Sequence, residues 1–342
     1  MTGKTIRLGI AGLGRLGRRH AETLVWNTRH CEVVAACSPV QAELDAARAD
    51  LGVQRTYADF ADLVNDRELD ALVLVTPTPL HADQTIAALE AGKHVFVEKP
   101  LALATADCER VQAVALRHPD QVAMVGFVRR FDPSYREAHA AVRRGDIGQP
   151  FLVRSQTCDM HDASGAFLKF APTSGGIFMD CSVHDIDLAR WLLGNPRALR
   201  AFASGTAAMH PALKEIGDVD NGLAIVEFEG GARAVFYASR TMAHGHETTT
   251  EVIGSAGSLN IGVGAHRDRV VRRDAAGVRH AVLADFHERF HEAFVAEMQQ
   301  FIAACRGDEA PALSVADATE ATRIGQALAR SLREGAVVDI AQ

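Results

Sequence analysis

The chain has 342 residues, a length that predicts about two domains with enough core to fold without disulfides or metal ions. Hydrophobic residues make up 48% of it and charged residues 23%, and 36 basic against 43 acidic side chains give a net charge of -7. This composition excludes a largely disordered chain, and the negative charge opposes binding to nucleic acid or to an anionic membrane. We therefore expect no nucleic acid and no membrane among its partners.

The sequence carries no sign of export. The opening residues, MTGKTIRLGIAGLG, lack the apolar stretch of a secretory signal, and no window approaches the ~18 apolar residues of a membrane span. The cysteines are scattered and none forms a CxxC pair. We expect reduced thiols and a cytoplasmic protein, and no metal site, because no HxxxH or CxxC supplies the usual local pair of ligands.

The first third alternates short β-branched runs with segments of helical periodicity, which is typical of parallel strands joined by crossover helices. Helices are expected between the strands, at 15–26, 41–50 and 82–91. The predicted strands are 6–11, 33–37, 71–75, 94–97 and 122–127. The pattern predicts an α/β fold with an N-terminal doubly wound Rossmann domain over residues 1–126, which binds a dinucleotide.

After about Gly126 the strands become longer and more alternating, and short turns such as Gly230-Gly231 join some of them directly. This hairpin behaviour predicts a C-terminal α+β domain over residues 127–342 with a largely antiparallel open sheet. The predicted strands are 151–159, 199–206, 223–229, 232–239 and 247–254. The helices expected to cover them are 133–144, 180–193, 287–305 and 315–333. We assign substrate binding and oligomerisation to this domain.

A glycine motif follows the first strand and opens the first helix. The segment Gly12-Leu13-Gly14-Arg15-Leu16-Gly17 has the GxGxxG pattern. Its glycines allow a tight turn, close approach of a pyrophosphate and close helix packing, while the helix N-terminus supplies unpaired N–H donors. A purely steric role is the alternative, but strand, turn and helix together favour a bound dinucleotide.

The adenosine end of the predicted cofactor site departs from the usual pattern. Where the second strand ends, an NAD-type fold usually carries Asp or Glu, but this chain has Cys37-Ser38-Pro39. Without that carboxylate, no negative side chain repels the 2′-phosphate of NADP, and Arg15 is placed to pair with this phosphate. These residues lean towards NADP. In the alternative, Arg15 lies on a solvated helix face and Ser38 bonds the ribose of NAD.

Three further segments carry candidate chemistry. Lys99 and Glu98 end the fourth strand in GKHVFVEKP, at the sheet edge where doubly wound folds bind ligands. Asp180 and His184, in GGIFMDCSVHDID, are four residues apart, so on one helix they share a face. Oxidising a secondary alcohol requires a base near neutral pKa, and histidine is the most suitable side chain. The third segment is TPTPLH, which ends the preceding strand with Thr76, Pro77 and His81.

Together these segments resemble the glucose-fructose oxidoreductase / inositol dehydrogenase / rhizopine catabolism (Gfo/Idh/MocA) family. The resemblance extends over almost the whole chain through GFVRRFDP, EVIG with GSL, and the closing ERF. The GGIFxDxxxHDxDLxRWLLG run is most similar to inositol 2-dehydrogenase-like members. It implies a catalytic set in which Lys99 donates to the reacting oxygen, His184 is the acid/base and Asp180 orients the substrate hydroxyl. It also implies a cis Lys99-Pro100 bond.

Further roles follow from the resemblance and from position. Arg129 is expected near cofactor and substrate, with Arg130 structural, Asp185 a helix-surface or capping partner and Cys181 in the core. The expected cofactor-binding residues are Gly12, Gly14, Arg15, Leu16, Gly17, Ser38, Thr76, Pro77, His81, Glu98, Lys99 and Arg129. The expected substrate-binding residues are Lys99, Arg129, Asp159, His161, Asp180, His184 and His246.

Two positions depart from the family pattern. His246 stands in Gly-His-Glu, where inositol dehydrogenase-like members tend to have a tyrosine in Gly-Tyr-Asp. The loop at 158–162 is also unusual: Asp159 or His161 bonds substrate hydroxyls, or the loop simply lies in solvent, and the residues alone leave both open.

The sequence thus predicts an NAD(P)-dependent oxidoreductase that transfers hydride between nicotinamide and a secondary alcohol of a cyclic polyol such as myo- or scyllo-inositol, or of a related sugar. A sugar C1 dehydrogenase or keto-sugar reductase of the same family is the alternative, and a non-catalytic dinucleotide-sensing regulator is a third. We expect a homo-oligomer, a dimer or tetramer, because family members usually pair their C-terminal sheets and the outer face here carries side chains such as Val235 and Tyr237.

Overall fold

The computed structural model describes residues 4–264 and 266–340. The chain forms two compact units, Met1–Val128 with Glu292–Thr322, and Arg129–His291 with Arg323–Gln342. The first break lies two residues beyond the predicted boundary at 126. Residues 292–322, which the sequence assigned to the second domain, belong to the first unit because aromatic side chains of this segment, Phe294 and Phe301, pack against His20 and Phe96.

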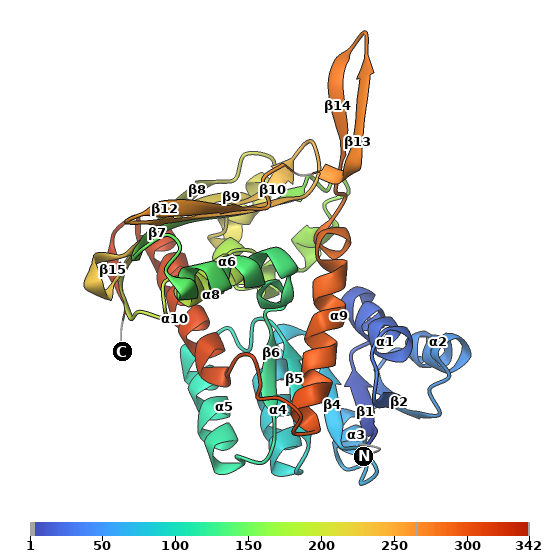
Figure 1. Cartoon of the computed structure of the whole chain (residues 1–342). Helices are drawn as coiled ribbons and strands as arrows, with labels where there is room; N and C mark the ends of the chain where they lie inside the picture. Colours follow the sequence, from blue (N-terminus) through green and yellow to red (C-terminus); the bar gives the residue numbers. More distant parts are fainter. Residues whose placement is uncertain (1–3, 265, 341–342) are drawn as a thin grey trace. The chain divides into compact units, whose positions relative to one another are not determined.

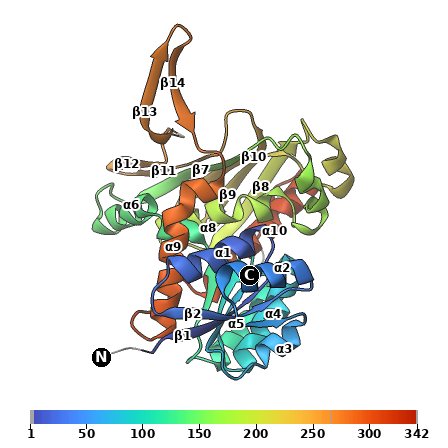
Figure 2. The same cartoon turned by 90° about the vertical axis from the view of Figure 1, so that its right-hand side faces the viewer.

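The first unit contains a six-stranded parallel sheet in the order β3-β2-β1-β4-β5-β6, which Figures 1 and 2 show from two sides. The chain order reverses between β1 and β4, the position at which doubly wound folds bind ligands. Its strands are β1 Ile6–Ala11, β2 Cys31–Cys37, β3 Arg55–Tyr57, β4 Ala71–Leu74, β5 His94–Glu98 and β6 Ala123–Gly126. Its helices are α1 Arg15–Trp26, α2 Gln41–Leu51, α3 Phe60–Val64, α4 His81–Glu90, α5 Thr105–Arg117 and parts of α9 Phe286–Cys305 and α10 Val315–Glu334.

Continuous runs of apolar residues explain why these strands form a parallel sheet that is buried on both faces. All four residues of β4 are fully buried, as expected of a parallel strand that is covered on both faces. The doubly wound α/β prediction is confirmed.

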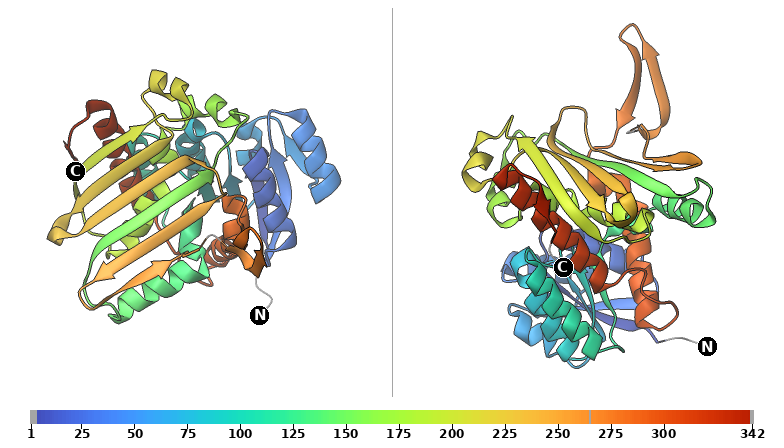
Figure 3. Two further views of the ribbon diagram at one scale, coloured as in Figure 1. Left: turned by 90° about the horizontal axis from the view of Figure 1, so that it is seen from above. Right: turned by 90° about the vertical axis from the view of Figure 1, so that its left-hand side faces the viewer.

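The second unit contains a seven-stranded sheet in the order β12-β11-β7-β10-β9-β8-β15. Figure 3 shows this sheet from above, with its strands side by side. Its strands are β7 Pro150–Met160, β8 Ala198–Thr206, β9 Asn221–Phe228, β10 Arg233–Met242, β11 Glu247–Gly254, β12 Gly257–Ile261 and β15 Val338–Asp339. Every pairing is antiparallel except β7 with β10, which is parallel, so the largely antiparallel prediction is confirmed.

The residues of this sheet alternate between a covered and an open face. In β9, for example, Ala224 and Val226 are buried whereas Leu223 and Ile225 are about half exposed. Helix α8 (Val183–Leu192) packs on β7 and β10, and α6 (Pro133–Arg144) packs on α8. The open face is thus apolar in part.

The helix predicted at 180–193 is in fact two. Helix α7 covers Ile177–Asp180 and α8 begins at Val183. The break arises because the N–H groups of Cys181 and Ser182 both bond to the carbonyl of Ile177, at 2.9 and 3.2 Å, which interrupts the regular hydrogen-bond ladder. Asp180 therefore ends one helix and His184 lies in the first turn of the next.

A separate two-stranded ribbon follows β12. It consists of β13 (His266–Asp274) and β14 (Gly277–Val282), which pair only with each other, and Figure 1 shows it standing away from the sheet that precedes it. We call residues 266–282 the arm. Among the described residues, no helix combines the length and the hydrophobicity needed to cross a bilayer.

Candidate active site

The glycine turn after β1 contains two close backbone approaches that only glycine allows. Gly12 has φ 87°, and a Cβ there would lie 2.3 Å from the Val75 carbonyl oxygen, while a Cβ on Gly17 would lie 1.9 Å from the Gly12 oxygen. Gly14 differs: a Cβ there meets nothing within 4 Å, and no side chain caps the helix start. The first N–H groups of α1, at Arg15 and Leu16, therefore suit an anion.

A carboxylate does stand at the end of β2, although the sequence analysis missed it. The buried Ser38 hydroxyl donates to Glu43 Oε2 at 2.5 Å and accepts from the Val40 N–H at 3.1 Å. Glu43 lies in the first turn of α2. The lean towards NADP depended on a site without a carboxylate, and Glu43 removes that premise.

The segments after β4 and β5 are joined by a buried histidine. His81 Nδ1 lies 2.9 Å from the Pro100 carbonyl and Nε2 lies 2.7 Å from the Thr76 carbonyl. Burial lowers the pKa of His81, and a neutral ring donates to only one of these two acceptors. The Lys99-Pro100 bond is cis, as the resemblance implied.

Glu98 connects the lysine segment to a buried cluster. Its Oε2 accepts from the Lys99 N–H at 3.0 Å, and its Oε1 lies 2.7 Å from His20 Nε2. Glu297 of α9 is fully buried, and neither of its carboxyl oxygens has a partner among the described residues. Burial, with Glu98 nearby, raises the pKa of Glu297 well above its usual value.

In the second unit, Asp180 is held by an arginine that the sequence analysis did not select. Arg240 Nη2 lies 3.0 Å from Asp180 Oδ2, and its guanidinium stacks over the Phe167 ring at 5.2 Å. Burial alone would lower the pKa of this guanidinium, but the neighbouring Cys181 and Asp180 raise it above its ordinary value. No spacing pattern links residue 240 to residue 180, so only the fold reveals the pair.

Asp159 and His246, which the sequence assigns to the substrate site, lie in contact with each other. His246 is buried, with Nδ1 2.9 Å from Asp159 Oδ1 and Nε2 2.7 Å from Thr248 Oγ1. The Asp159 side chain is 40% exposed. Because both ring nitrogens are engaged, His246 orients Asp159, and the exposed carboxylate is the better placed of the two to meet a hydroxyl.

Arg129 has internal partners. Its Nη1 lies 2.8 Å from Asp185 Oδ1 and its Nη2 2.7 Å from Thr157 Oγ1. Asp185 is fully buried and also accepts from Ser155, so the prediction that Asp185 is a helix-surface or capping partner was wrong: its carboxylate bonds to side chains of β7 and Arg129. Ligand contact by Arg129 stays a prediction.

The remaining loop residue, His161, stacks on another histidine. The His161 and His210 rings lie 5.2 Å apart, and Phe167 meets His210 edge-on at 4.8 Å. His161 thus packs within the second unit instead of lying free in solvent.

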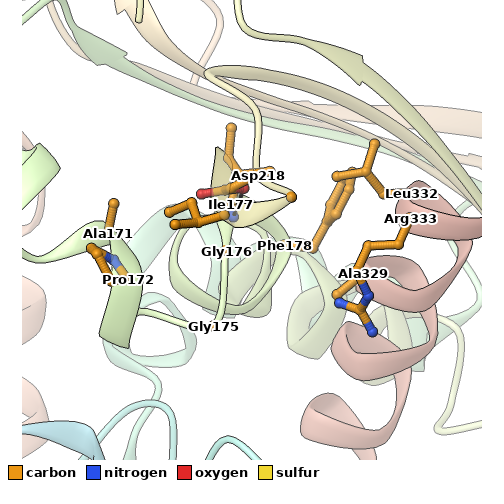
Figure 4. A pocket seen from close by; sticks show the side chains of 12 residues that line it. Ala171, Pro172, Gly175, Gly176, Ile177, Phe178, Asp218, Ala329, Leu332 and Arg333 are labelled. Carbon is orange, nitrogen blue, oxygen red and sulfur yellow. Dashed lines mark hydrogen bonds between the residues drawn. The ribbon is translucent and has the colours of Figure 1, made fainter. Parts of the chain in front are cut away.

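A cavity of about 190 Å³ lies beside the segment that leads to Asp180. Its lining includes Gly176, Phe178, Asp218 and Arg333, which Figure 4 shows. Neither Asp180 nor His184 lines it. The substrate residues are therefore assigned from the side-chain contacts above and not from this cavity.

Two family models match the chain. The oxidoreductase family with an NAD-binding Rossmann fold matches residues 6–127, and the GFO/IDH/MocA C-terminal domain matches residues 135–260. The chain is 36% identical over 335 residues to scyllo-inositol 2-dehydrogenase (NAD(+)) of Bacillus subtilis, covering 98% of this chain and 96% of that protein.

Solved structures agree with this likeness. The crystal structure of scyllo-inositol dehydrogenase from Lactobacillus casei with bound NAD(H) and scyllo-inositol matches with TM-score 0.95 at 37% identity, covering 99% of this chain and 100% of that one. That of myo-inositol 2-dehydrogenase from Lactobacillus plantarum matches with TM-score 0.95 at 38% identity, with the same coverage. The glycine turn and these full-length matches together place the chain in the Gfo/Idh/MocA family of oxidoreductases.

Proposed function

We propose that this protein is an NAD-dependent dehydrogenase that transfers hydride between a ring carbon of myo- or scyllo-inositol and nicotinamide. The observation that carries the proposal is the Asp180–Arg240 pair, with Asp180 four residues before His184 in the chain. A buried guanidinium that holds a carboxylate in the segment leading to a histidine suits proton transfer, whereas a cofactor sensor has no need of it. The relatives named for inositol oxidation support the same substrate class.

In the proposed reaction the alcohol loses a proton and a hydride and becomes a ketone. His184 takes the hydroxyl proton, and Lys99 donates a hydrogen bond to the oxygen as negative charge develops on it. Asp180 orients the substrate and stabilises the imidazolium that forms. NAD supplies the hydride acceptor, bound by the first domain at the N-terminus of α1, while the second domain binds the polyol through Asp159 as well.

We propose NAD and not NADP as the cofactor. The Glu43 carboxylate beside Ser38 would repel a 2′-phosphate, whereas it can accept hydrogen bonds from the ribose hydroxyls of NAD. We also propose a cytoplasmic, homo-oligomeric protein. All the cysteines are free thiols, which suits a reducing compartment. The half-exposed Leu223 and Ile225 on the open sheet face suit pairing with a second copy.

A panel of inositols, hexoses and keto-sugars, assayed by nicotinamide absorbance with both cofactors, tests the proposal. We expect an inositol with NAD to give the highest kcat/KM. A hexose oxidised at C1, or a keto-sugar reduced in preference, would instead identify one of the other family activities. NAD binding without any turnover would identify a sensor.

Substitution of the proposed base tests its role. His184→Ala should abolish turnover and leave NAD binding unchanged, whereas His291→Ala, at an exposed position, should change neither. Residual turnover in the His184 variant would show that another group is the base.

A further inference from the structure

A chain of buried polar side chains in the first unit leads from helix α9 to Lys99. Glu297 of α9 and His20 of α1 are at most 2% exposed. His20 Nε2 lies 2.7 Å from Glu98 Oε1, and Glu98 Oε2 accepts from the Lys99 N–H at 3.0 Å. The chain therefore connects helices α9 and α1 to the end of β5, where the proposed reaction places its lysine.

The position of Glu297 along α9 turns its carboxyl group towards His20. The ring of Phe294 meets that of His20 edge-on, with centroids 5.5 Å apart. Phe301 meets the ring of Phe96, which in turn lies 5.6 Å from the His20 ring. Residues three before and four after a helical position share its face, so Glu297 lies on the face of α9 that contacts these rings.

The hydrogen-bonding groups of this chain are complementary when Glu297 carries a proton. A carboxylate can only accept, so His20 donates from Nε2 to Glu98 and, in its neutral form, presents Nδ1 as an acceptor. His20 Nδ1 and both carboxyl oxygens of Glu297 are buried without a partner among the described residues. Unpaired buried polar atoms are unfavourable, and a protonated Glu297 satisfies His20 Nδ1 after a small side-chain shift or through one water.

The charges nearby also favour a neutral Glu297. Burial, together with the negative charge of Glu98, raises the pKa of Glu297 well above its usual value. The titratable groups around Glu98 itself are His20, His81 of α4 and the adjacent Lys99. The negative charge of Glu98 thus has neighbours that can carry positive charge, whereas an ionised Glu297 would face a charge of its own sign.

Glu98 holds the backbone on one side of Lys99, and a second buried side chain holds the other. The Glu98 carboxylate accepts from the Lys99 N–H, whereas His81 Nδ1 lies 2.9 Å from the Pro100 carbonyl oxygen. A Cβ on Gly126 would lie 3.1 Å from Glu98 Cδ, so β6 leaves this carboxyl group little room to move. A change in the charge or orientation of Glu98 therefore reaches the lysine segment directly.

We propose that Glu297 and His20 are positioning residues for Lys99. The proton on Glu297 keeps the His20 ring in the form that donates to Glu98, and that carboxylate in turn fixes the lysine segment. The inference rests on the role of Lys99 in the proposed function. In the opposite assignment an ionised Glu297 meets a cationic ring, which places three charges in an apolar setting.

Steady-state kinetics of the whole chain, with NAD and the polyol or sugar that it turns over fastest, test the proposal. We compare Glu297→Leu with Glu297→Gln, whose amide can still donate to His20. We likewise compare His20→Leu with His20→Gln, whose amide can still donate to Glu98. Met298→Ala, at a buried neighbouring position of α9, is the control for lost packing, and Glu292→Leu, at an exposed position, is the control for the introduced leucine.

We expect Glu297→Leu and His20→Leu to lower kcat about tenfold while KM for NAD changes less, and the two glutamine variants to recover most of that loss. Met298→Ala should lower Tm and keep the wild-type kcat, and Glu292→Leu should change neither. As pH rises and Glu297 loses its proton, kcat of the wild type should fall while that of Glu297→Gln persists. A wild-type kcat in Glu297→Leu, or an equal loss in Glu297→Gln and Met298→Ala, would overturn the proposal.

Infrared spectroscopy of the protein without substrate separates this inference from the proposed function. At neutral pH the wild type should show the C=O stretch of a buried, protonated carboxylic acid, which Glu297→Gln lacks and which His20→Leu shifts in frequency. A wild-type spectrum without this band would overturn the proposal even if inositol were oxidised. If the band is present and no polyol or sugar is turned over, the proposed function fails, and of this proposal only the part that concerns Lys99 falls with it.

Discussion

Glu43, a residue of helix α2, places a carboxylate next to Ser38 at the end of strand β2. A carboxylate at this place opposes a 2′-phosphate by like-charge repulsion, worth about 1 to 2 kcal/mol at a partly exposed site. Glu43→Gln should therefore raise kcat/KM with NADP about tenfold and leave that with NAD within a factor of a few. Asp45→Asn, two residues along on the exposed side of α2, is the control. An unchanged cofactor ratio would show that Glu43 does not set the preference.

Arg240 is proposed to act through Asp180 and not by touching the substrate. Removing the guanidinium leaves a carboxylate without the ion pair that holds it. Arg240→Met should lower kcat about 10- to 100-fold with KM for NAD unchanged, and Arg240→Lys should recover part of the loss. Steady-state kinetics with both substrates check this.

The control for that experiment is Arg200→Met, which removes an exposed pair with Glu227 on the open sheet face. It should leave kcat and KM unchanged. If Arg240→Met and Arg200→Met behaved alike, the positioning role would be excluded.

At the scale of elements, alanine substitutions at two glycines of the turn from β1 to α1 should have different effects on folding and on NAD binding. Gly17→Ala forces a Cβ to within 1.9 Å of a carbonyl oxygen, so it should lower Tm markedly. Gly14→Ala meets no protein atom, so Tm should hold while Kd for NAD rises at least tenfold because the methyl lies where the pyrophosphate approaches. Thermal melts and a binding titration separate the two; undiminished NAD binding by Gly14→Ala would place the cofactor elsewhere.

We expect the free energy of unfolding to depend on pH through Glu297 of helix α9. Its raised pKa means that the folded protein holds this proton where the unfolded chain releases it. Stability is therefore lost as pH rises from the usual glutamate value towards the raised one, by up to about 1.4 kcal/mol per pH unit. Glu297→Gln, which mimics the neutral acid, should be more stable than wild type by a margin that grows with pH.

Melting curves at several pH values measure that margin. For Glu292→Gln, at an exposed position of the same helix, the melting temperature should change with pH as it does in wild type. Parallel curves for Glu297→Gln as well would mean that this carboxyl is charged in the folded protein.

The elements show which features local patterns can predict. Five of the six strands of the first sheet were predicted to within two residues, because buried β-branched runs and glycine turns are local signals, but the short edge strand β3 (Arg55–Tyr57) was missed. The break after Asp180 was missed, since it depends on the carbonyl of Ile177 receiving two N–H groups. The arm was missed as well, because its mixed charges and valines lack the regular alternation of a half-buried strand.

At the candidate site, the sequence mainly failed to predict contacts between side chains that lie far apart along the chain. Lys99, Asp180 and His184 stand in recognisable motifs, whereas Arg240 and Glu43 carry no pattern of their own. Their importance comes from tertiary contacts, 60 residues along the chain in the Arg240–Asp180 pair. The burial of Asp185 likewise depends on β7, which no helical periodicity foretells.

At the scale of the whole molecule, the proposed site residues come from both units. The first has the glycine turn, Glu43 and Lys99, and the second has Asp180, His184 and the Asp159–His246 pair. The central claim is that a ring carbon of a cyclic polyol gives its hydride to NAD with these residues handling the proton.

The most direct test is to incubate the protein with NAD and inositol deuterated at its ring carbons, and to analyse the reduced cofactor by mass spectrometry. We expect one deuterium in each reduced nicotinamide, formed more slowly than with unlabelled inositol, and none with His184→Ala. Reduced cofactor without deuterium, or no reduction by any inositol although NAD binds, would contradict it.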